Sequence, residues 1–394
     1  MKALPTKTNR LHALDALRGI MMLLGIVLHS ALTYSVTPHG DAWSIKDPNS
    51  TSLATDFLVL LIHTFRMPLF FMVAGFFGAL LFYERSALKM IKNRFSRIVL
   101  PFIVFLSLLW PVIVFAFGYT HGVFLAKPKP LKHALRMLSS IQDFIPKSTS
   151  HLWFLYYLML ITIATVLIAL LLRTLPILKI KTKAVFKAIL KNPLIRIISL
   201  ATIVGLLLKV FGSSMVATSV SLVPDYHTFS YYFIFYLLGW LVYASKEPLT
   251  LFVKYSWLTT GLAVVFSIAE GLIITAYNLN PSGNSNLLIA FSAIIVSLFI
   301  FGLTGLFVRY ASTHSPKLRY ISDASYWVYL IHLPITVLIP AALANLSLPA
   351  LIKFFIVILV TGVICFVSYH YLVRNTFIGK FLNGKRFPLK AVQD

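Results

Sequence analysis

The stretch LDALRGIMMLLGIVLHSALTYS, residues 14–35, decides how this chain folds, because it is apolar enough to cross a membrane yet contains Arg18 and His29. At about 100° per residue, the eleven positions that separate the two residues bring both side chains to one helix face, about 16 Å apart along its axis. An arginine at bilayer depth costs about 2.5–3.5 kcal/mol on insertion scales. The pair therefore indicates a buried polar path with a function. The alternative is that Arg18 only extends to the cytoplasmic headgroups.

The composition of the chain is that of a membrane protein with many helical crossings. Of its 394 residues, 59% are hydrophobic and 12% are charged, so no large soluble domain fits. The net charge of +24 does not predict a nucleic-acid partner, because the basic residues lie between apolar runs and not in one patch. A single cysteine, Cys365, excludes disulfides and cysteine-rich metal sites, and we assign it no role.

Ten apolar windows have the length of about 20 residues that a helix needs to span the bilayer. We therefore expect an all-α, polytopic integral membrane protein with about ten transmembrane helices in one domain, residues 1–394. The expected helices lie near 12–36, 55–83, 98–119, 152–172, 196–216, 228–245, 256–277, 286–308, 323–345 and 350–372. A basic cytoplasmic tail, residues 373–394, follows the last of them.

Lysine and arginine determine the expected orientation. The connections 84–97, 173–196 and 374–390 are rich in them, whereas the connection 37–54 has only Lys46. The positive-inside rule then places both termini in the cytoplasm. The segment 173–196 has no acidic residue, and we expect it to form an amphipathic helix on anionic lipid.

The third connection, residues 120–150, is an exception because it is basic although it falls on the predicted outer side. In it, KPKP at 127–130 precedes a possible short amphipathic helix at 131–144. The connection is long enough to be a lid or an acceptor-binding element, and it is equally compatible with a mere connector.

The second expected helix contains HTFRMPLFFMVAGFF, in which His63 and Arg66 are three positions apart and share a face. Counted from the outer ends of the helices, their depth nearly matches that of His29. A lone histidine inside a membrane usually makes a hydrogen bond between helices, worth about 0.6–2 kcal/mol. Two histidines and an arginine at one depth favour a shared site instead.

The ninth expected helix opens with SDASYWVYLIHLP, in which Tyr329 and His332 lie on one polar stripe from the cytoplasmic end to mid-membrane. We expect Ser322 or Asp323 to cap this helix. The proline that ends the motif predicts a kink beside His332.

HLWFL opens the fourth expected helix at the outer boundary. Trp153 there fits an aromatic belt. His151 is either an acceptor contact or a solvated helix end.

Arg94 and Arg97 precede the third expected helix on the cytoplasmic side, and they lie near Arg18 if the first three helices pack together. Three planar guanidinium groups could hold the phosphates of a cofactor. The positive-inside rule alone also explains the presence of Arg94 and Arg97 beside a transmembrane helix. We expect Asp15 to pair with Arg18 and lower the cost of burial.

Glu270 and Lys209 are further charges within apolar helices, and the sequence identifies no partner for either. The chain has no P-loop, HExxH, GxSxG or glycine-rich dinucleotide motif. Its histidines lack acidic companions at ligand spacing, so we predict no metal site and favour histidine as a proton carrier.

Five motifs then become informative together: the arginine and histidine of the first helix, Gly75-Phe76, RFSRIVLP at 94–101, HLWFL and the SYxxYLxH of the ninth helix. They resemble the acyltransferase-3 family of membrane O-acyltransferases over nearly the whole chain. Within this family, the chain looks most like the branch that adds succinyl groups to osmoregulated periplasmic glucans. It has Ala74 where the family often has serine.

The resemblance implies a multi-pass protein of the bacterial inner membrane. Its donor substrate would be cytoplasmic acyl-CoA, either succinyl-CoA or acetyl-CoA, with no permanently bound cofactor. Its acceptor would be a hydroxyl group of a periplasmic glucan or a surface polysaccharide. His29 would act as general base or acyl carrier, with Arg66 or His63 stabilising the oxyanion.

The remaining site residues follow from the same resemblance and from their expected depths. Those assigned to the acyl-CoA site are Arg18, Arg94, Arg97, Tyr329 and His332. Those assigned to the acceptor are His151 and Trp153. Two other function classes stay open, namely a proton-coupled secondary transporter that uses the His/Arg cluster and a scaffold in envelope assembly.

Overall fold

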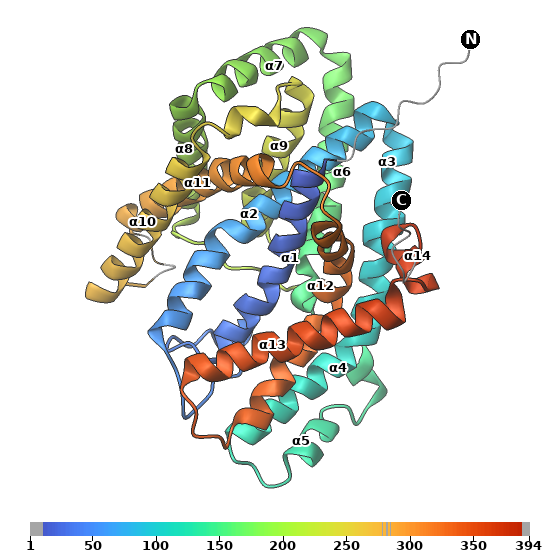
Figure 1. The fold of residues 1–394 in the computed structure, drawn as a ribbon, viewed down its shortest axis with the longest axis vertical. Coiled ribbons are helices and arrows are strands. Elements are labelled where there is room, and N and C mark those ends of the chain that lie inside the picture. The colour runs from blue at the N-terminus through green and yellow to red at the C-terminus, as the bar shows by residue number, and fades with distance from the viewer. Residues whose placement is uncertain (1–10, 278, 281–282, 284, 388–394) are drawn as a thin grey trace.

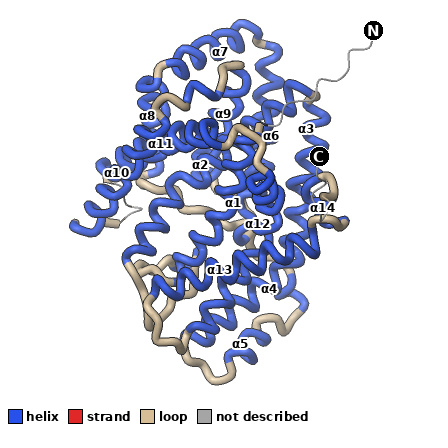
Figure 2. Tube along the Cα trace, viewed as in Figure 1, coloured by secondary structure: helices blue, strands red, loops and turns tan. Residues whose placement is uncertain are grey.

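The computed structural model describes residues 11–277, 279–280, 283 and 285–387. Helices dominate this part of the chain, and no strand occurs within these ranges (Figure 2). The α-helices are α1 (His12–Thr33), α2 (Leu53–Glu84), α3 (Ala87–Arg94), α4 (Leu100–Phe124), α5 (Pro130–Arg136), α6 (Trp153–Thr174), α7 (Pro176–Lys191), α8 (Pro193–Phe211), α9 (Tyr226–Ser245), α10 (Ser256–Ala276), α11 (Asn286–Tyr310), α12 (Pro316–Leu343), α13 (Ala350–Ser368) and α14 (Phe377–Asn383).

Nine helices within the described ranges are long and apolar enough to cross a membrane, which confirms the expected all-α polytopic architecture. The tenth expected crossing, 228–245, exists as α9 but is not among the nine. Its tyrosine, serine and threonine residues lower its hydropathy. α9 packs along α2, below α7 in Figure 1, and much of its surface meets protein.

The first and last described helices begin and end at the same end of the bundle. There, the Ser322 hydroxyl of α12 donates to the Asp15 carbonyl of α1 at 3.1 Å. The Asn383 amide of α14 donates to the Asp323 carbonyl at 3.0 Å. A chain that enters and leaves on one side crosses an even number of times, so this arrangement supports α9 as a tenth crossing.

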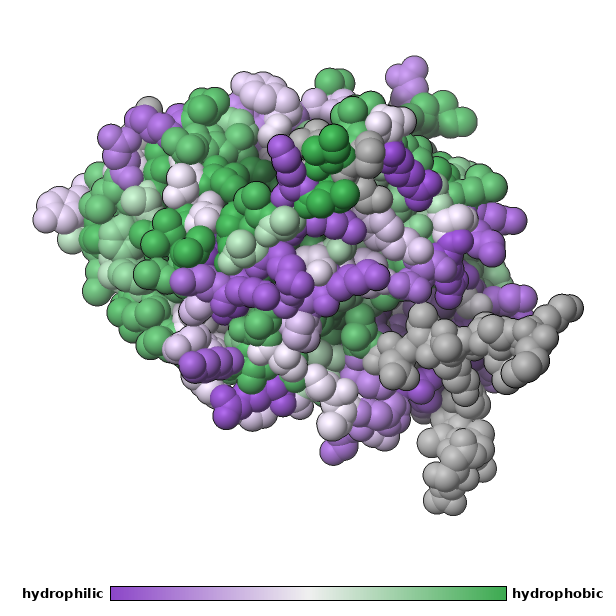
Figure 3. Space-filling view, turned by 90° about the horizontal axis from the view of Figure 1, so that it is seen from above, coloured by the Kyte–Doolittle hydropathy of each residue, from purple (hydrophilic) through white to green (hydrophobic). Residues whose placement is uncertain are grey.

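α7 forms within the basic segment 173–196, as expected, and lies at the top of Figure 1. Lys187 of this helix pairs with Glu247 at 2.7 Å, and this hydrogen bond holds the pKa of Glu247 below its usual range. The view from above in Figure 3 shows hydrophilic residues gathered across this face, beside a hydrophobic flank. Such a face suits contact with lipid headgroups.

Two boundaries differ from the sequence expectation. α12 begins at Pro316 and is capped by the Ser315 hydroxyl, which accepts a hydrogen bond from the Leu318 N–H at 3.4 Å. The expected cap at residues 322–323 is therefore wrong, because a proline without an N–H suits the first helical position. The helix expected at 131–144 is divided into α5 and a short 3₁₀ turn, Ile141–Phe144.

α2 and α9 approach so closely that their contact requires glycine. A Cβ atom at Gly239 would lie 1.8 Å from the Met72 carbonyl oxygen. One at Gly75 would lie 2.0 Å from the Tyr236 carbonyl oxygen. The glycine of the Gly-Phe motif therefore has a packing role, like small residues at other membrane helix contacts.

We expect Gly239→Ala to destabilise the protein by about 1–3 kcal/mol, because the added methyl group forces the two backbones apart. Thermal unfolding in detergent micelles measures the effect as a lower midpoint. Gly261→Ala is the matched control, because a Cβ atom there meets no atom within 4 Å. Equal midpoints for the two variants would contradict the close approach.

Candidate active site

The centre of the candidate site is a cluster of three imidazole rings from three helical elements. The His29 ring of α1 lies 5.2 Å from the His332 ring of α12, measured between centroids. The His332 ring lies 5.5 Å from that of His151, which belongs to the 3₁₀ turn before α6. His151 is only 7% exposed, so the solvated helix end considered for it is wrong. The fold thus joins residues that the sequence assigned to three different roles.

Arg66 reaches this cluster because α1 has a glycine one turn before His29. Arg66 is 7% exposed, and its Nε donates to the Met21 carbonyl at 3.0 Å. A Cβ atom at Gly25 would lie 3.0 Å from Arg66 Nη2 and 3.2 Å from His332 Nε2. The guanidinium and the imidazole therefore converge on the bare backbone of Gly25. A fixed positive charge in this position can stabilise a developing oxyanion.

Contacts with two backbone carbonyls determine which ring nitrogen of His332 is protonated. Its Nδ1 lies 2.8 Å from the Tyr329 oxygen and 3.2 Å from the Val328 oxygen. Carbonyl oxygens only accept hydrogen bonds, so Nδ1 carries the proton. Nε2 then keeps its lone pair and faces the cluster, where it can accept a proton.

The tautomer of His151 is assigned by a break in the hydrogen bonding of α12. Pro334 has no N–H and cannot satisfy the Leu330 carbonyl one turn earlier. His151 Nε2 donates to that carbonyl at 2.9 Å, and the Tyr329 hydroxyl donates to the His151 carbonyl at 2.8 Å. The expected kink position is therefore the point where α12 is joined to the start of α6.

The remaining ring nitrogens have no protein partner. His29 Nδ1, His151 Nδ1 and His332 Nε2 are buried and make no hydrogen bond to any residue in the described ranges. Buried polar atoms are normally paired, and exceptions often have a catalytic role. Three of them in one cluster favour a site for a polar substrate over a structural core.

Two predicted site residues lie beside the cluster and not in it. His63 is half-buried, and its Nε2 lies 3.4 Å from the Val216 carbonyl oxygen, although its ring is close enough to interact electrostatically with Arg66. Trp153 packs against the ring of Tyr232, with centroids 5.3 Å apart.

The three arginines of the expected phosphate site differ in their surroundings. Arg18 pairs with Asp15 at 3.3 Å, as expected, and keeps 36% of its side chain exposed. Arg94 donates to the Ala74 carbonyl at 3.2 Å and lies close enough to Arg18 for their charges to interact. Arg97 donates to the Lys380 and Phe381 carbonyls of α14. Arg97 therefore fastens α14, whereas the other two form a cationic pair.

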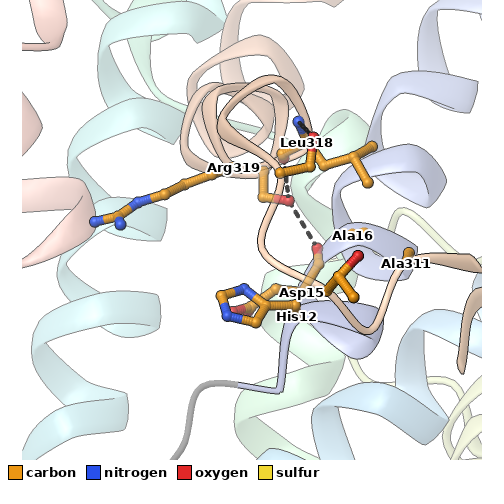
Figure 4. A pocket seen from close by; sticks show the side chains of 9 residues that line it. His12, Asp15, Ala16, Ala311, Leu318 and Arg319 are labelled. Carbon is orange, nitrogen blue, oxygen red and sulfur yellow. Dashed lines mark hydrogen bonds between the residues drawn. The ribbon is translucent and has the colours of Figure 1, made fainter. Parts of the chain in front are cut away.

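A small surface hollow lies next to the Asp15–Arg18 pair, between the beginnings of α1 and α12. Figure 4 shows His12 and Asp15 at this hollow, while Arg319 extends away from them. The Ser322 hydroxyl joins the two helices here. The hollow lies at the bundle end that the sequence assigns to the cytoplasm.

The connection between α1 and α2 covers the opposite end of the cluster. Trp43 of this loop stacks on His29, with centroids 5.1 Å apart and planes at 19°. Its indole N–H donates to the Thr33 hydroxyl at 3.1 Å. The sequence alone did not identify Trp43 as a site residue, because a loop has no periodicity that fixes the direction of a side chain. The available signal was a tryptophan in the connection between the first two apolar helices.

A fully buried ion pair anchors this loop to α13. Lys353 Nζ lies 2.9 Å from an Asp47 carboxylate oxygen, and both side chains have no exposed surface. The other carboxylate oxygen accepts the N–H groups of Asn49 and Ser50, at 2.9 and 3.1 Å. The loop that places Trp43 is therefore held rigidly at one end.

The two other intramembrane charges also have partners. Glu270 accepts a hydrogen bond from the Ser292 hydroxyl of α11 at 2.9 Å. Lys209 Nζ lies 2.7 Å from the Asn286 side-chain oxygen. Both pairs lie on α8, α10 and α11, and neither belongs to the histidine cluster.

Comparison with known proteins gives a consistent family assignment. The family model described as an acyltransferase domain, acyltransferase 3, matches residues 11–370. Glucans biosynthesis protein C of Escherichia coli K12 is 26% identical over 343 residues, which cover 84% of this chain and 83% of that protein. The same protein of Escherichia coli O157:H7 shows the same identity and coverage. No solved structure matched the chain.

Proposed function

Since this chain belongs to the acyltransferase-3 family and is a membrane acyltransferase, we propose that it moves an acyl group from cytoplasmic acyl-CoA to a carbohydrate hydroxyl. The proposed acyl group is succinyl or acetyl. The proposed acceptor is a periplasmic glucan or another cell-surface carbohydrate, in line with the name of the Escherichia coli relatives. The proposed location is the bacterial inner membrane.

The main support for this proposal is the cluster of His29, His332 and His151 around Arg66. Its unpaired nitrogen atoms can accept the proton of an acceptor hydroxyl. The hydroxyl oxygen then forms an ester bond with the acyl carbon while the carbon–sulfur bond of the thioester breaks. The proton passes to the sulfur of coenzyme A, so the reaction is balanced without a further reactant.

His29 is the proposed general base, and Arg66 the proposed oxyanion stabiliser. The Arg66 guanidinium is fixed by the Met21 carbonyl, so it does not need to reorganise when negative charge develops on the thioester oxygen. The Nε2 lone pair of His332 provides a second proton acceptor beside it. His63 is close enough to Arg66 for a supporting electrostatic role.

Arg18 and Arg94 are the proposed phosphate contacts of coenzyme A. They form the cationic pair at the end of the bundle where α1 begins and α14 ends, and Asp15, the partner of Arg18, lines the small hollow there. Pantetheine is long and flexible enough to reach along α1 from Arg18 toward His29, about 16 Å away. We leave Arg97 out of this contact set, because its guanidinium already binds α14.

The test compares cells with and without the protein by mass spectrometry of their periplasmic and surface glycans. We expect a mass difference of one acyl group, which identifies both the group and the acceptor. Membrane vesicles with labelled acyl-CoA provide the direct assay, in which Arg18→Ala should mainly raise the donor KM. Uptake of a labelled solute by liposomes without acyl-CoA, together with no transfer, would favour the transporter alternative and overturn the proposal.

A further inference from the structure

The loop between α1 and α2 forms a hollow that Trp43 lines. The hollow has a volume of about 180 Å³ and is lined by Leu32, Thr37, Pro38, His39, Gly40, Trp43, Ser44, Ile45 and Lys46. Most of these residues are exposed, so the hollow opens to the surface. Trp43 is only 5% exposed and also stacks on His29. It therefore lies between the hollow and the histidine cluster.

Among the side chains that the structure describes around the hollow, the charged groups Lys46, Asp47 and Asp56 have partners. Lys46 Nζ donates to the Val36 carbonyl at 2.5 Å. The Asp56 carboxylate accepts the N–H groups of Val36 and Thr37 at 2.7 and 2.9 Å. Asp47 is held by its ion pair with α13. The hollow thus presents hydroxyl groups, an imidazole and an indole, which suit a neutral ligand rich in hydroxyl groups.

His39 provides a polar contact without a partner in this hollow. Its Nε2 is buried and makes no hydrogen bond to any described residue. Burial lowers the pKa of His39, although the nearby Asp56 carboxylate opposes the shift. The ring is therefore neutral at pH 7 and can both donate and accept a hydrogen bond.

The loop is fixed at its two ends, and the packing of the Trp43 side chain holds it between them. Asp56 caps residues 36–37, and the Asp47–Lys353 pair anchors the other end. Between them, Trp43 is held by the indole hydrogen bond to Thr33, the stacking on His29 and an edge contact with Phe117, whose ring centroid is 5.2 Å away. All three are contacts of one side chain, so a local opening of the middle of the loop can break them while the ends stay in place.

We propose that residues 37–46 form a vestibule for one sugar unit of the carbohydrate acceptor and that Trp43 is the gate between this vestibule and His29. The inference rests on the proposed function, because it assigns the acceptor route of the same reaction. The occupant of the vestibule is a neutral glycosyl unit.

The gate is tested by the accessibility of a cysteine at position 29. The variant carries His29→Cys and Cys365→Ser, and sealed vesicles expose the loop side to a membrane-impermeant thiol reagent. Adding Trp43→Ala should speed labelling at least about tenfold, since the open minor state of a two-state element is commonly about 0.1–10% populated. Thr33→Val should give a smaller increase, because it removes only the hydroxyl that receives the indole N–H.

Two controls separate gating from a general loss of packing. Trp43→Phe retains an aromatic ring and should stay slow. Trp110→Ala removes another nearly buried tryptophan, which donates to the Asp143 carbonyl at 3.0 Å, and should not expose the thiol at position 29. Equal labelling rates with and without Trp43 would overturn the gate.

The occupant is tested with Ser44→Cys in the Cys365→Ser background. A linear glucan oligosaccharide should slow labelling at position 44 and leave Thr51→Cys unchanged, because Thr51 is exposed in the same connection but outside the hollow. Equal slowing at both positions, or none, overturns the vestibule. Both labelling assays are independent of acyl transfer. Their failure beside a persistent glycan mass shift therefore overturns this inference alone, whereas an intact gate without transfer overturns the proposed function.

Discussion

Replacing His29 with alanine should lower acyl transfer by about 10²–10⁴-fold, the range that general-base catalysis usually contributes. The ring lies at the Trp43 end of the cluster, between Trp43 and His332, so its removal leaves an acceptor hydroxyl that enters past Trp43 without its nearest proton acceptor. Transfer of labelled acyl groups from acyl-CoA to glycan in membrane vesicles measures the loss. Protein amount in the membrane is measured in parallel by immunoblot.

His133→Ala is the matched control for this variant. His133 belongs to α5, outside the cluster, and its ring contacts Lys127. We expect it to keep near-normal transfer. If the His29 variant retains full transfer at equal protein levels, His29 is not the base.

Lys353→Met should destabilise the protein by about 3–5 kcal/mol, the usual cost of leaving one member of a buried ion pair alone. The Asp47 carboxylate would stay buried with two backbone N–H groups and no counter-charge. Thermal unfolding in detergent and the monodisperse fraction in size-exclusion chromatography measure the loss.

The double variant Lys353→Met with Asp47→Asn distinguishes charge from packing. Asparagine can still accept the N–H groups of Asn49 and Ser50, and it leaves no unpaired charge, so much of the stability should return. Lys209→Met is the control, because Lys209 is exposed and bonds only a neutral amide. If the double variant is as unstable as the single variant, the ion pair does not explain the loss of stability.

Much of the fold could be predicted from the sequence because membrane crossings depend on local apolar length. The windows at 286–308 and 350–372 lie within a few residues of α11 and α13. α9 shows the limit of this principle, since a crossing enclosed by protein can carry tyrosine and serine. The start of α12 was misplaced because proline at a first helical position was not recognised as a start signal.

The candidate site was only partly predictable. A charge inside an apolar run identified Arg18, Arg66 and His29, because burial of such groups needs a reason wherever they fold. The approach of His332 and His151 to His29 depends on tertiary packing, which spacing along one helix does not reveal. The Asp47 partner of Lys353 lies 306 positions away in the sequence, so no local pattern could join them.

The proline in α12 has an effect that reaches beyond its own helix. An imino acid is usually regarded as a defect in a transmembrane segment, yet here the orphaned Leu330 oxygen decides which nitrogen of His151 is protonated. Replacing Pro334 with a residue that has a backbone N–H would give the Leu330 carbonyl a competing donor. His151 could then carry its proton on either ring nitrogen. A proline in α12 thus determines which ring nitrogen is protonated in a histidine of another element.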